Sequence, residues 1–184
     1  AFQMAALKKL PILYLVQDNE WDISAHSSEM RAVNATHYAK GFGLKTYTID
    51  GTDFTTSYQT IQKAFKEIRG KRTPILIHAK VPLLNHHTSG VRMEWYRDDL
   101  DEARSRDPFP KLRKELVDNG FLKDDLKKLE IEATKLVKTD YEKALNAEDP
   151  NPEDLFTHQF APTPILEEKG DRSPKNKEPT VMVD

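Results

Sequence analysis

An oxygen-rich segment, Gln17–Ser24, follows an apolar run and holds the residue types best suited to bind a cation. It contains two Asp, one Asn, one Glu and one Gln. A hard cation such as Mg²⁺ prefers carboxylate, carboxamide and carbonyl oxygens, at about 2.1 Å. The same residue types also form ordinary turns, in which Asp and Asn side chains bond backbone N–H groups. Spacing alone favours the turn, and the cation site stays open beside it.

Two adjacent histidines, His86 and His87, stand in a second polar segment, Asn85–Gly90. Neighbouring side chains point in different directions, and no carboxylate lies at a helical ligand spacing, so the pair does not form a typical metal site. A histidine beside Thr, Ser and Gly is suited to hydrogen bonding with a phosphate or carbonyl oxygen. A pair of solvated loop histidines is the alternative.

The other histidines, the charged run and the aromatic pair beside it are expected to have structural rather than functional roles. His78 lies in an apolar run and is expected to be a core residue with a satisfied ring, rather than a ligand. The charged run 97–107 is expected to form a solvated face, and Trp95–Tyr96 beside it to cover a neighbouring surface. Three further histidines lie among polar residues and need no functional role: His26, His37 and His158.

The elements that position these segments alternate between strand and helix. Three short apolar runs predict buried strands, and two amphipathic segments between them predict helices. In the second helix one stripe of apolar residues (Phe54, Tyr58, Ile61, Phe65, Ile68) is expected to face the core. This alternation is typical of an α/β fold with a parallel sheet flanked by helices, which binds ligands at the carboxyl ends of its strands. The predicted strands are 11–16, 44–49 and 74–79, and the predicted helices are 29–40 and 54–68.

The second half of the chain differs in composition. Residues 81–107 show little periodicity, and a loop of this length is expected to be functional and mobile until its partners bind. Helices are predicted over 110–117 and 123–146, and the prolines that recur from residue 149 predict an extended tail. We therefore expect an α/β domain with a helical end over 1–148 and a Pro-rich linker over 149–184. Apolar patterns run into both ends of the sequence, which indicates a fragment.

The bulk composition excludes several classes of protein. Twenty-eight Lys and Arg nearly balance 30 Asp and Glu, giving a net charge of −2 that argues against nucleic acid and anionic membranes as partners. The chain contains no cysteine, which excludes disulfides, thiolate metal sites and thiol nucleophiles. No apolar run approaches the roughly 18 residues of a membrane span. A soluble, cytoplasmic protein is expected.

Four motifs, in order along the chain, resemble the alpha subunit of thiamine diphosphate-dependent 2-oxo acid dehydrogenases. Asp18-Asn19 stands where this family has Asn-Asn, and Glu20–Ser24 stands where it commonly has Gly-Tyr-Ala-Ile-Ser. Asp50–Asp53 resembles its Asp-Gly-Asn-Asp turn. The sequence His-His-Thr-Ser at 86–89 and the Pro-rich segment starting at Asp149 resemble the branched-chain type more than the pyruvate type.

The resemblance implies thiamine diphosphate and Mg²⁺ as cofactors and assigns roles to individual residues. Asn19 would bind Mg²⁺ through its side-chain oxygen, and Trp21 through its backbone carbonyl. Ile23 would lie close to the cofactor, and His87 would reach the diphosphate or the reacting centre from a mobile loop. Gln17 stands where an arginine of the family often contacts the diphosphate.

The resemblance also implies partners and a reaction. The enzyme would decarboxylate a small branched-chain 2-oxo acid, such as 2-oxoisovalerate, and transfer the acyl group to a lipoyl acyltransferase component. A beta region or subunit would complete the site, in an oligomer, and the tail would lead towards a fused beta region. Two departures concern phosphate binding: Gln17, and Leu83 where another arginine is common. The family's Gly-Asp-Gly, with its acidic Mg²⁺ ligand, would fall before Ala1.

Two other classes of protein stay open. A non-catalytic α/β binding or assembly module would account for the missing Gly-Asp-Gly. Another thiamine diphosphate enzyme on the same fold, of the transketolase kind, is the second alternative, although the His-His-Thr-Ser segment argues against it.

Overall fold

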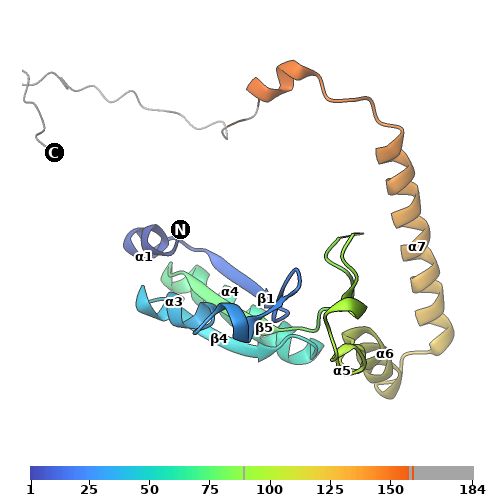
Figure 1. Ribbon diagram of the computed structural model, residues 1–184, viewed down its shortest axis with the longest axis horizontal. Helices are drawn as coiled ribbons and strands as arrows, with labels where there is room; N and C mark the ends of the chain where they lie inside the picture. Colours follow the sequence, from blue (N-terminus) through green and yellow to red (C-terminus); the bar gives the residue numbers. More distant parts are fainter. Residues whose placement is uncertain (89, 158, 160–184) are drawn as a thin grey trace, which may run out of the picture. The chain divides into compact units, whose positions relative to one another are not determined.

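A parallel three-stranded sheet forms the centre of the computed structural model, which describes residues 1–88, 90–157 and 159 (Figure 1). The strands are β1 (Leu13–Asp18), β4 (Lys45–Asp50) and β5 (Ile75–Lys80), in the spatial order β1-β5-β4. The register pairs Asp18 with Lys80 and Asp50 with Lys80, so all three strands end together. This confirms the predicted α/β fold with a parallel sheet flanked by helices.

Helices cover both faces of the sheet. On one face α4 (Phe54–Lys71) packs Ala64 and Ile68 against the central strand. On the other, α1 (Phe2–Lys8) and α3 (Ala35–Gly41) pack against the same strand around Leu76. Side chains alternate along a strand, so Ile75 and Ile77 face α4, whereas Leu76 and His78 face α3. The buried core therefore lies in two layers around β5.

Two sequence expectations about burial were wrong. Only β5 is buried along nearly its whole length, whereas the edge strand β1 leaves Leu15 about half exposed. Of the predicted apolar stripe on α4, only Ile68 is buried, with Ile61 packed at the margin of the core. The other three residues of the stripe are exposed: Phe54, Tyr58 and Phe65. A three-stranded sheet offers the helix a narrow contact surface, and the small residue Ala64 lets α4 approach it closely.

The predicted helix 29–40 is broken into two. The short helix α2 (Ser27–Met30) ends where Arg31 turns to an extended conformation, with φ −141° and ψ 130°. Asn34 then begins α3, because its side chain accepts a hydrogen bond from the N–H of Thr36 at 3.1 Å. Before α2, the chain makes a small antiparallel hairpin of β2 (Trp21–Asp22) and β3 (Ala25–His26).

Residues 81–107 are more structured than the sequence predicted. They contain a short 3₁₀ helix, η1 (Met93–Trp95), and a helix, α5 (Leu100–Ser105). Met93, Arg97 and Ala103 are buried and fix the second half of this segment. Aperiodic sequence concealed this order, because the segment packs through single side chains rather than along one continuous face.

Helices follow towards the C-terminus, much as predicted. They are α6 (Pro108–Asp118) and α7 (Lys123–Leu145). A 3₁₀ helix, η2 (Pro152–Phe156), replaces the expected extended chain there, because proline is compatible with the first turn of a helix. The described part of the chain divides into two units, with the boundary between Glu132 and Ala133. The predicted boundary at 148–149 stays a prediction, and the expected tail lies mostly outside the described residues, as does His158. None of the helices in the described ranges is long and apolar enough to cross a membrane.

Candidate functional site

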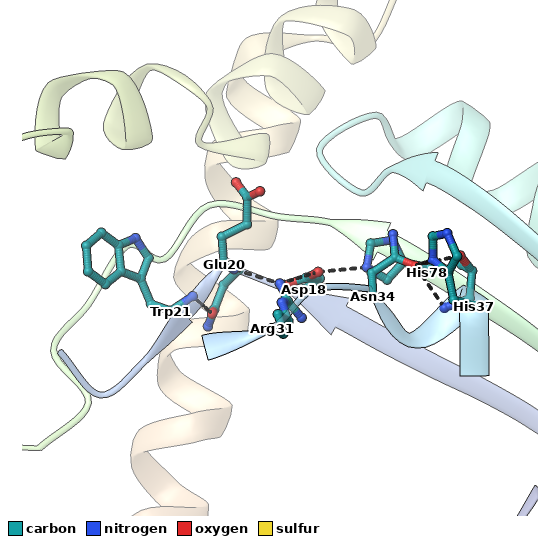
Figure 2. Close-up of polar contacts among 9 residues, drawn as sticks. Asp18, Glu20, Trp21, Arg31, Asn34, His37 and His78 are labelled. Atoms are coloured by element: carbon teal, nitrogen blue, oxygen red, sulfur yellow. Dashed lines mark hydrogen bonds and ion pairs between the residues drawn. The ribbon is translucent and has the colours of Figure 1, made fainter. Parts of the chain in front are cut away.

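The segment after β1 is a tight turn built by its own side chains. Asp18 Oδ1 accepts a hydrogen bond from the N–H of Glu20 at 3.0 Å, and Asn19 Oδ1 accepts one from the N–H of Trp21, also at 3.0 Å (Figure 2). Glu20 has a positive φ of 65°, and Ile23 at the tip of the hairpin one of 52°. Left-handed backbone is uncommon for residues other than glycine, and for a β-branched residue such as Ile23 it is strained.

The ordinary turn and the cation site are compatible here. In an antiparallel pair, opposite residues alternate between pairs that are hydrogen-bonded to each other and pairs that are not. The N–H of Ser27 donates to the carbonyl of Glu20 at 2.8 Å, so the next pair, Trp21 and His26, is not hydrogen-bonded. The backbone polar groups of Trp21 are then directed away from β3, consistent with the bond from its N–H to Asn19. An amide oxygen has two lone pairs, so Asn19 keeps one for a further partner. The Asn19 side chain and the Trp21 carbonyl therefore remain able to bind a cation.

A pocket of about 210 Å³ lies beside this turn, at the carboxyl ends of β1 and β5. The hairpin contributes one side of it, including Asn19, Glu20 and Trp21, and the segments 81–83 and 97–106 contribute the other. Its charged lining residues are two arginines and three carboxylates: Arg97, Arg106, Glu20, Asp99 and Glu102. Such a lining, with oxygen donors from Asn19 and Trp21, fits a divalent cation that neutralises a bound phosphate. Among the described residues, no group of three or more His, Asp or Glu could hold a metal, so the chain's donors fit part of a coordination shell.

Arg97 forms the wall of the pocket and is buried, which corrects the expectation of a solvated charged face. Its guanidinium makes two bonds to the Asp99 carboxylate, at 2.7 and 2.8 Å, and donates to the carbonyl of Leu83 at 2.9 Å. The guanidinium also lies 5.0 Å from the centre of the Trp21 ring. The hydrogen bond from Arg97 holds the pKa of Asp99 below its usual range, outweighing burial.

The pair Trp95–Tyr96 behaves only partly as expected. The ring of Tyr96 packs against Trp21, with ring centres 5.6 Å apart, and covers a neighbouring surface as predicted. Trp95 is 71% exposed. The two side chains point in different directions because the chain turns at η1, so that one ring is exposed and the other packs on Trp21.

A buried charge network stands on the opposite side of the turn, towards α3. The Asp18 carboxylate is 8% exposed and bonds Arg31 Nη2 at 2.6 and 2.7 Å and His78 Nε2 at 2.7 Å (Figure 2). Burial acts to raise the pKa of Asp18, but the hydrogen bonds from Arg31, the Glu20 N–H and His78 outweigh it and lower that pKa. His78 is a core residue, as predicted, although its Nδ1 is buried without a partner among the described residues.

The loop histidines play different roles. His86 Nδ1 accepts a hydrogen bond from the N–H of Met93 at 3.0 Å and so ties the tip of the loop to η1. His87 is exposed beside it, which leaves its imidazole accessible to a ligand. His26 caps the N-terminus of α2, with Nδ1 2.8 Å from the Ser28 hydroxyl. His37 Nδ1 lies 3.0 Å from Asn34 Oδ1, next to the start of α3.

The structure brings together only some of the residues predicted for the site. Asn19 and Trp21 line the same pocket, joined there by Leu83 and Arg97. Ile23, at the hairpin tip, and His87 do not line it. Gln17 is exposed in β1, one position before Asp18 and therefore on the other face of the sheet, so its contact with a diphosphate stays a prediction. Arg97 was missed because nothing in its charged sequence surroundings marks it as buried.

A parallel sheet with a polar pocket at the carboxyl ends of its strands defines an α/β protein. The profile of one family, the dehydrogenase E1 component, matches residues 1–153. The chain therefore belongs to the dehydrogenase E1 component family, which confirms the resemblance to the dehydrogenase component of 2-oxo acid dehydrogenases.

Its relatives include alpha subunits with two different substrates in their names. The chain is 30% identical over 167 residues to the pyruvate dehydrogenase E1 component subunit alpha of Rickettsia bellii, covering 87% of this chain and 50% of that protein. It is 30% identical over 169 residues to the same subunit of Porphyra purpurea, covering 86% and 47%. It is 29% identical over 165 residues to the 3-methyl-2-oxobutanoate dehydrogenase subunit alpha of Mycobacterium tuberculosis, covering 88% and 45%. The chain spans about half the length of these relatives, and the matches do not favour the branched-chain type.

Proposed function

We propose that this chain forms the diphosphate-binding part of a thiamine diphosphate-dependent 2-oxo acid dehydrogenase component. The observation that carries the proposal is the turn after β1, in which Asn19 Oδ1 accepts a hydrogen bond from the Trp21 N–H and both residues line the pocket. When bound, thiamine diphosphate supplies the carbanion that attacks the 2-oxo acid, while the protein contributes position and electrostatics.

In this proposal the chain's own residues bind and orient the cofactor. Asn19 Oδ1 and the Trp21 carbonyl oxygen would supply two of the oxygen ligands that Mg²⁺ favours, and the cofactor would supply others. Ile23 at the hairpin tip packs against the cofactor. His87 hydrogen-bonds the diphosphate or the reacting centre from the exposed tip of the loop.

The same proposal assigns partners and a location. A beta region or subunit completes the site, and a lipoyl acyltransferase component receives the acyl group. The relatives named as E1 component subunits alpha support this arrangement for the family. The enzyme acts as an oligomer in the cytoplasm.

For the substrate we propose a branched-chain 2-oxo acid. The supporting observations are the His-His-Thr-Ser sequence at 86–89 and the relative named for 3-methyl-2-oxobutanoate, which is a branched 2-oxo acid. Pyruvate is the second candidate, because the relatives from Rickettsia bellii and Porphyra purpurea carry it in their names.

The test is a substrate assay on the assembled enzyme, in which this chain stands within its complete alpha region beside the beta partner. Decarboxylation of 2-oxoisovalerate that requires both thiamine diphosphate and Mg²⁺ is the expected result. A higher kcat/KM for pyruvate would overturn the substrate assignment and leave the reaction intact. Failure of the assembly to bind thiamine diphosphate would instead support a non-catalytic assembly module.

A further inference from the structure

The buried carboxylate of Asp18 joins three parts of the chain at one point. It accepts hydrogen bonds from its own turn, through the N–H of Glu20 at 3.0 Å, and from Arg31 at 2.6 and 2.7 Å. His78 of the central strand supplies the third partner at 2.7 Å. Figure 2 shows Arg31 and His78 converging on this carboxylate from separate segments.

The ion pair between Asp18 and Arg31 joins the two ends of the segment 18–31, which contains the proposed metal ligands. The chain leaves the sheet at Asp18, makes the β2–β3 hairpin and α2, and reaches Arg31, whose side chain bonds back to Asp18. Asn19 and Trp21 lie within this segment. Its first residue is also fixed through the backbone, because the N–H of Val81 donates to the Asp18 carbonyl at 3.0 Å. The hairpin is thus tied to the sheet at both of its ends.

His78, in the central strand β5, holds the Asp18 carboxylate in place relative to the sheet. Its side chain is 1% exposed, and its Nε2 lies 2.7 Å from Asp18 Oδ2, while Nδ1 has no partner among the described residues. A buried ring nitrogen without a partner costs free energy that an apolar residue would not cost at this position. The contact with Asp18 compensates for that cost and places the carboxylate relative to β5.

We propose that Asp18 and Arg31 are positioning residues, which hold the Asn19–Trp21 segment in the geometry that Mg²⁺ requires. This inference rests on the proposed function. Mg²⁺ accepts only near-octahedral geometry with short oxygen distances, so a loosened hairpin binds it poorly. The Asp18 carboxylate is 8% exposed and needs a cation beside it, and the ion pair with Arg31 neutralises it next to the proposed metal site.

The test measures Mg²⁺ affinity of the assembled enzyme at a fixed concentration of thiamine diphosphate. Arg31→Met leaves the Asp18 carboxylate without its cation, and we expect the Kd for Mg²⁺ to rise roughly tenfold, as when outer-shell partners of metal ligands are removed. At saturating Mg²⁺, kcat should change less than this Kd, because Arg31 does not touch the reacting atoms. Arg31→Lys retains the charge and should restore most of the affinity.

The matched control is the ion pair between Lys45 and Glu67, which is equally short at 2.6 Å but joins β4 to α4. Lys45→Met should leave the Mg²⁺ affinity unchanged. An equal rise in Kd for Lys45→Met and Arg31→Met would mean a general loss of stability and would overturn the proposal.

Hydrogen exchange provides a readout that needs no cofactor. In the full chain, Arg31→Met should speed exchange of the amides of Glu20 and Trp21, whereas Lys45→Met should not. If Arg31→Met leaves both the exchange of the Glu20 and Trp21 amides and the Mg²⁺ affinity as in the wild type, the positioning role is wrong. This holds even if Asn19→Ala abolishes Mg²⁺ binding. Faster exchange in Arg31→Met, with Mg²⁺ affinity unaffected by Asn19→Ala, would support the positioning of the hairpin and reject the metal site instead. If Arg31→Met does not fold, Asp18→Asn removes the same ion pair while keeping an acceptor for Glu20.

Discussion

The guanidinium of Arg97 lies 5.0 Å from the centre of the Trp21 ring. Residues far apart in sequence thus connect the two sides of the pocket, since Arg97 belongs to the segment after β5 and Trp21 to the hairpin after β1. The cation–aromatic contact joins the two segments. The bonds from Arg97 to Asp99 and to the carbonyl of Leu83 hold the guanidinium in place within the segment after β5.

Arg97→Met should destabilise the chain by roughly 2 kcal/mol, because the Leu83 carbonyl and the Asp99 carboxylate lose a charged hydrogen-bond donor. Urea unfolding measures this difference. Trp21 fluorescence should report it as well, in a Trp95→Phe background that leaves Trp21 as the sole tryptophan. Arg104 is the control, because it is 59% exposed and pairs with a fully exposed Asp101, so that Arg104→Met should have little effect.

Glu20→Gly should stabilise the chain by about 1 kcal/mol. Glu20 holds a φ of 65°, and this left-handed conformation costs other residues roughly 1–2 kcal/mol that glycine does not pay. The greater freedom of glycine in the unfolded chain offsets part of the gain. Thermal unfolding measures the change. Glu20→Ala keeps the strain and should show no gain, and a similar gain for both variants would contradict this explanation.

Asn19→Ala should weaken Mg²⁺–thiamine diphosphate binding by the assembled enzyme at least roughly tenfold, since even outer-shell changes at metal sites have effects of that size. Asn19→Asp retains an oxygen for both the metal and the Trp21 N–H, and should bind more tightly than the alanine variant. Titration of intrinsic fluorescence gives both affinities. Asn119→Ala, at the exposed end of α6, is the control. Equal affinities of the wild type and Asn19→Ala would reject Asn19 as a ligand.

The stability contributed by Asp53 should be lost in acid, between about pH 4 and pH 2. The N–H of Thr56 and the ammonium of Lys111 lower the pKa of Asp53 from 3.8 to about 2. Because the folded-state pKa is the lower one, the contribution is present above the unfolded value and disappears as the pH falls through the folded value. Asp53→Asn keeps the cap of α4 but cannot titrate, so its Tm should fall less steeply over this range. High salt should reduce the difference, because Lys111 is exposed and Asp53 is partly exposed.

The purified 184-residue chain should not decarboxylate 2-oxo acids. Its described residues supply two candidate oxygen ligands at the pocket and no cluster of metal-binding side chains, and the chain spans about half the length of its relatives. The measurement is release of CO₂ from 2-oxoisovalerate and from pyruvate with saturating Mg²⁺ and thiamine diphosphate. Turnover by this chain alone would show that its own residues form a complete site.

Local pattern was enough to predict most of the elements. Apolar runs identify the three strands to within two residues, because burial between helices demands apolar side chains on both faces of β5 and on one face of its neighbours. The adjacency of Asn19 and Trp21 is also local, since the two residues belong to one turn. The resemblance could therefore assign their oxygens as a pair, and the metal role of that pair stays a prediction.

Tertiary structure decided which charged residues are buried. Asp18 and His78 are 60 positions apart, and they meet only because the parallel register pairs Asp18 with Lys80 and leaves His78 on the same face of the sheet. Arg31 reaches Asp18 from the point where the predicted helix breaks. A single sequence does not show which strands pair in which register, nor which distant residue will offset the cost of burying a charge. The network around Asp18 and the burial of Arg97 could therefore be seen only in the folded chain.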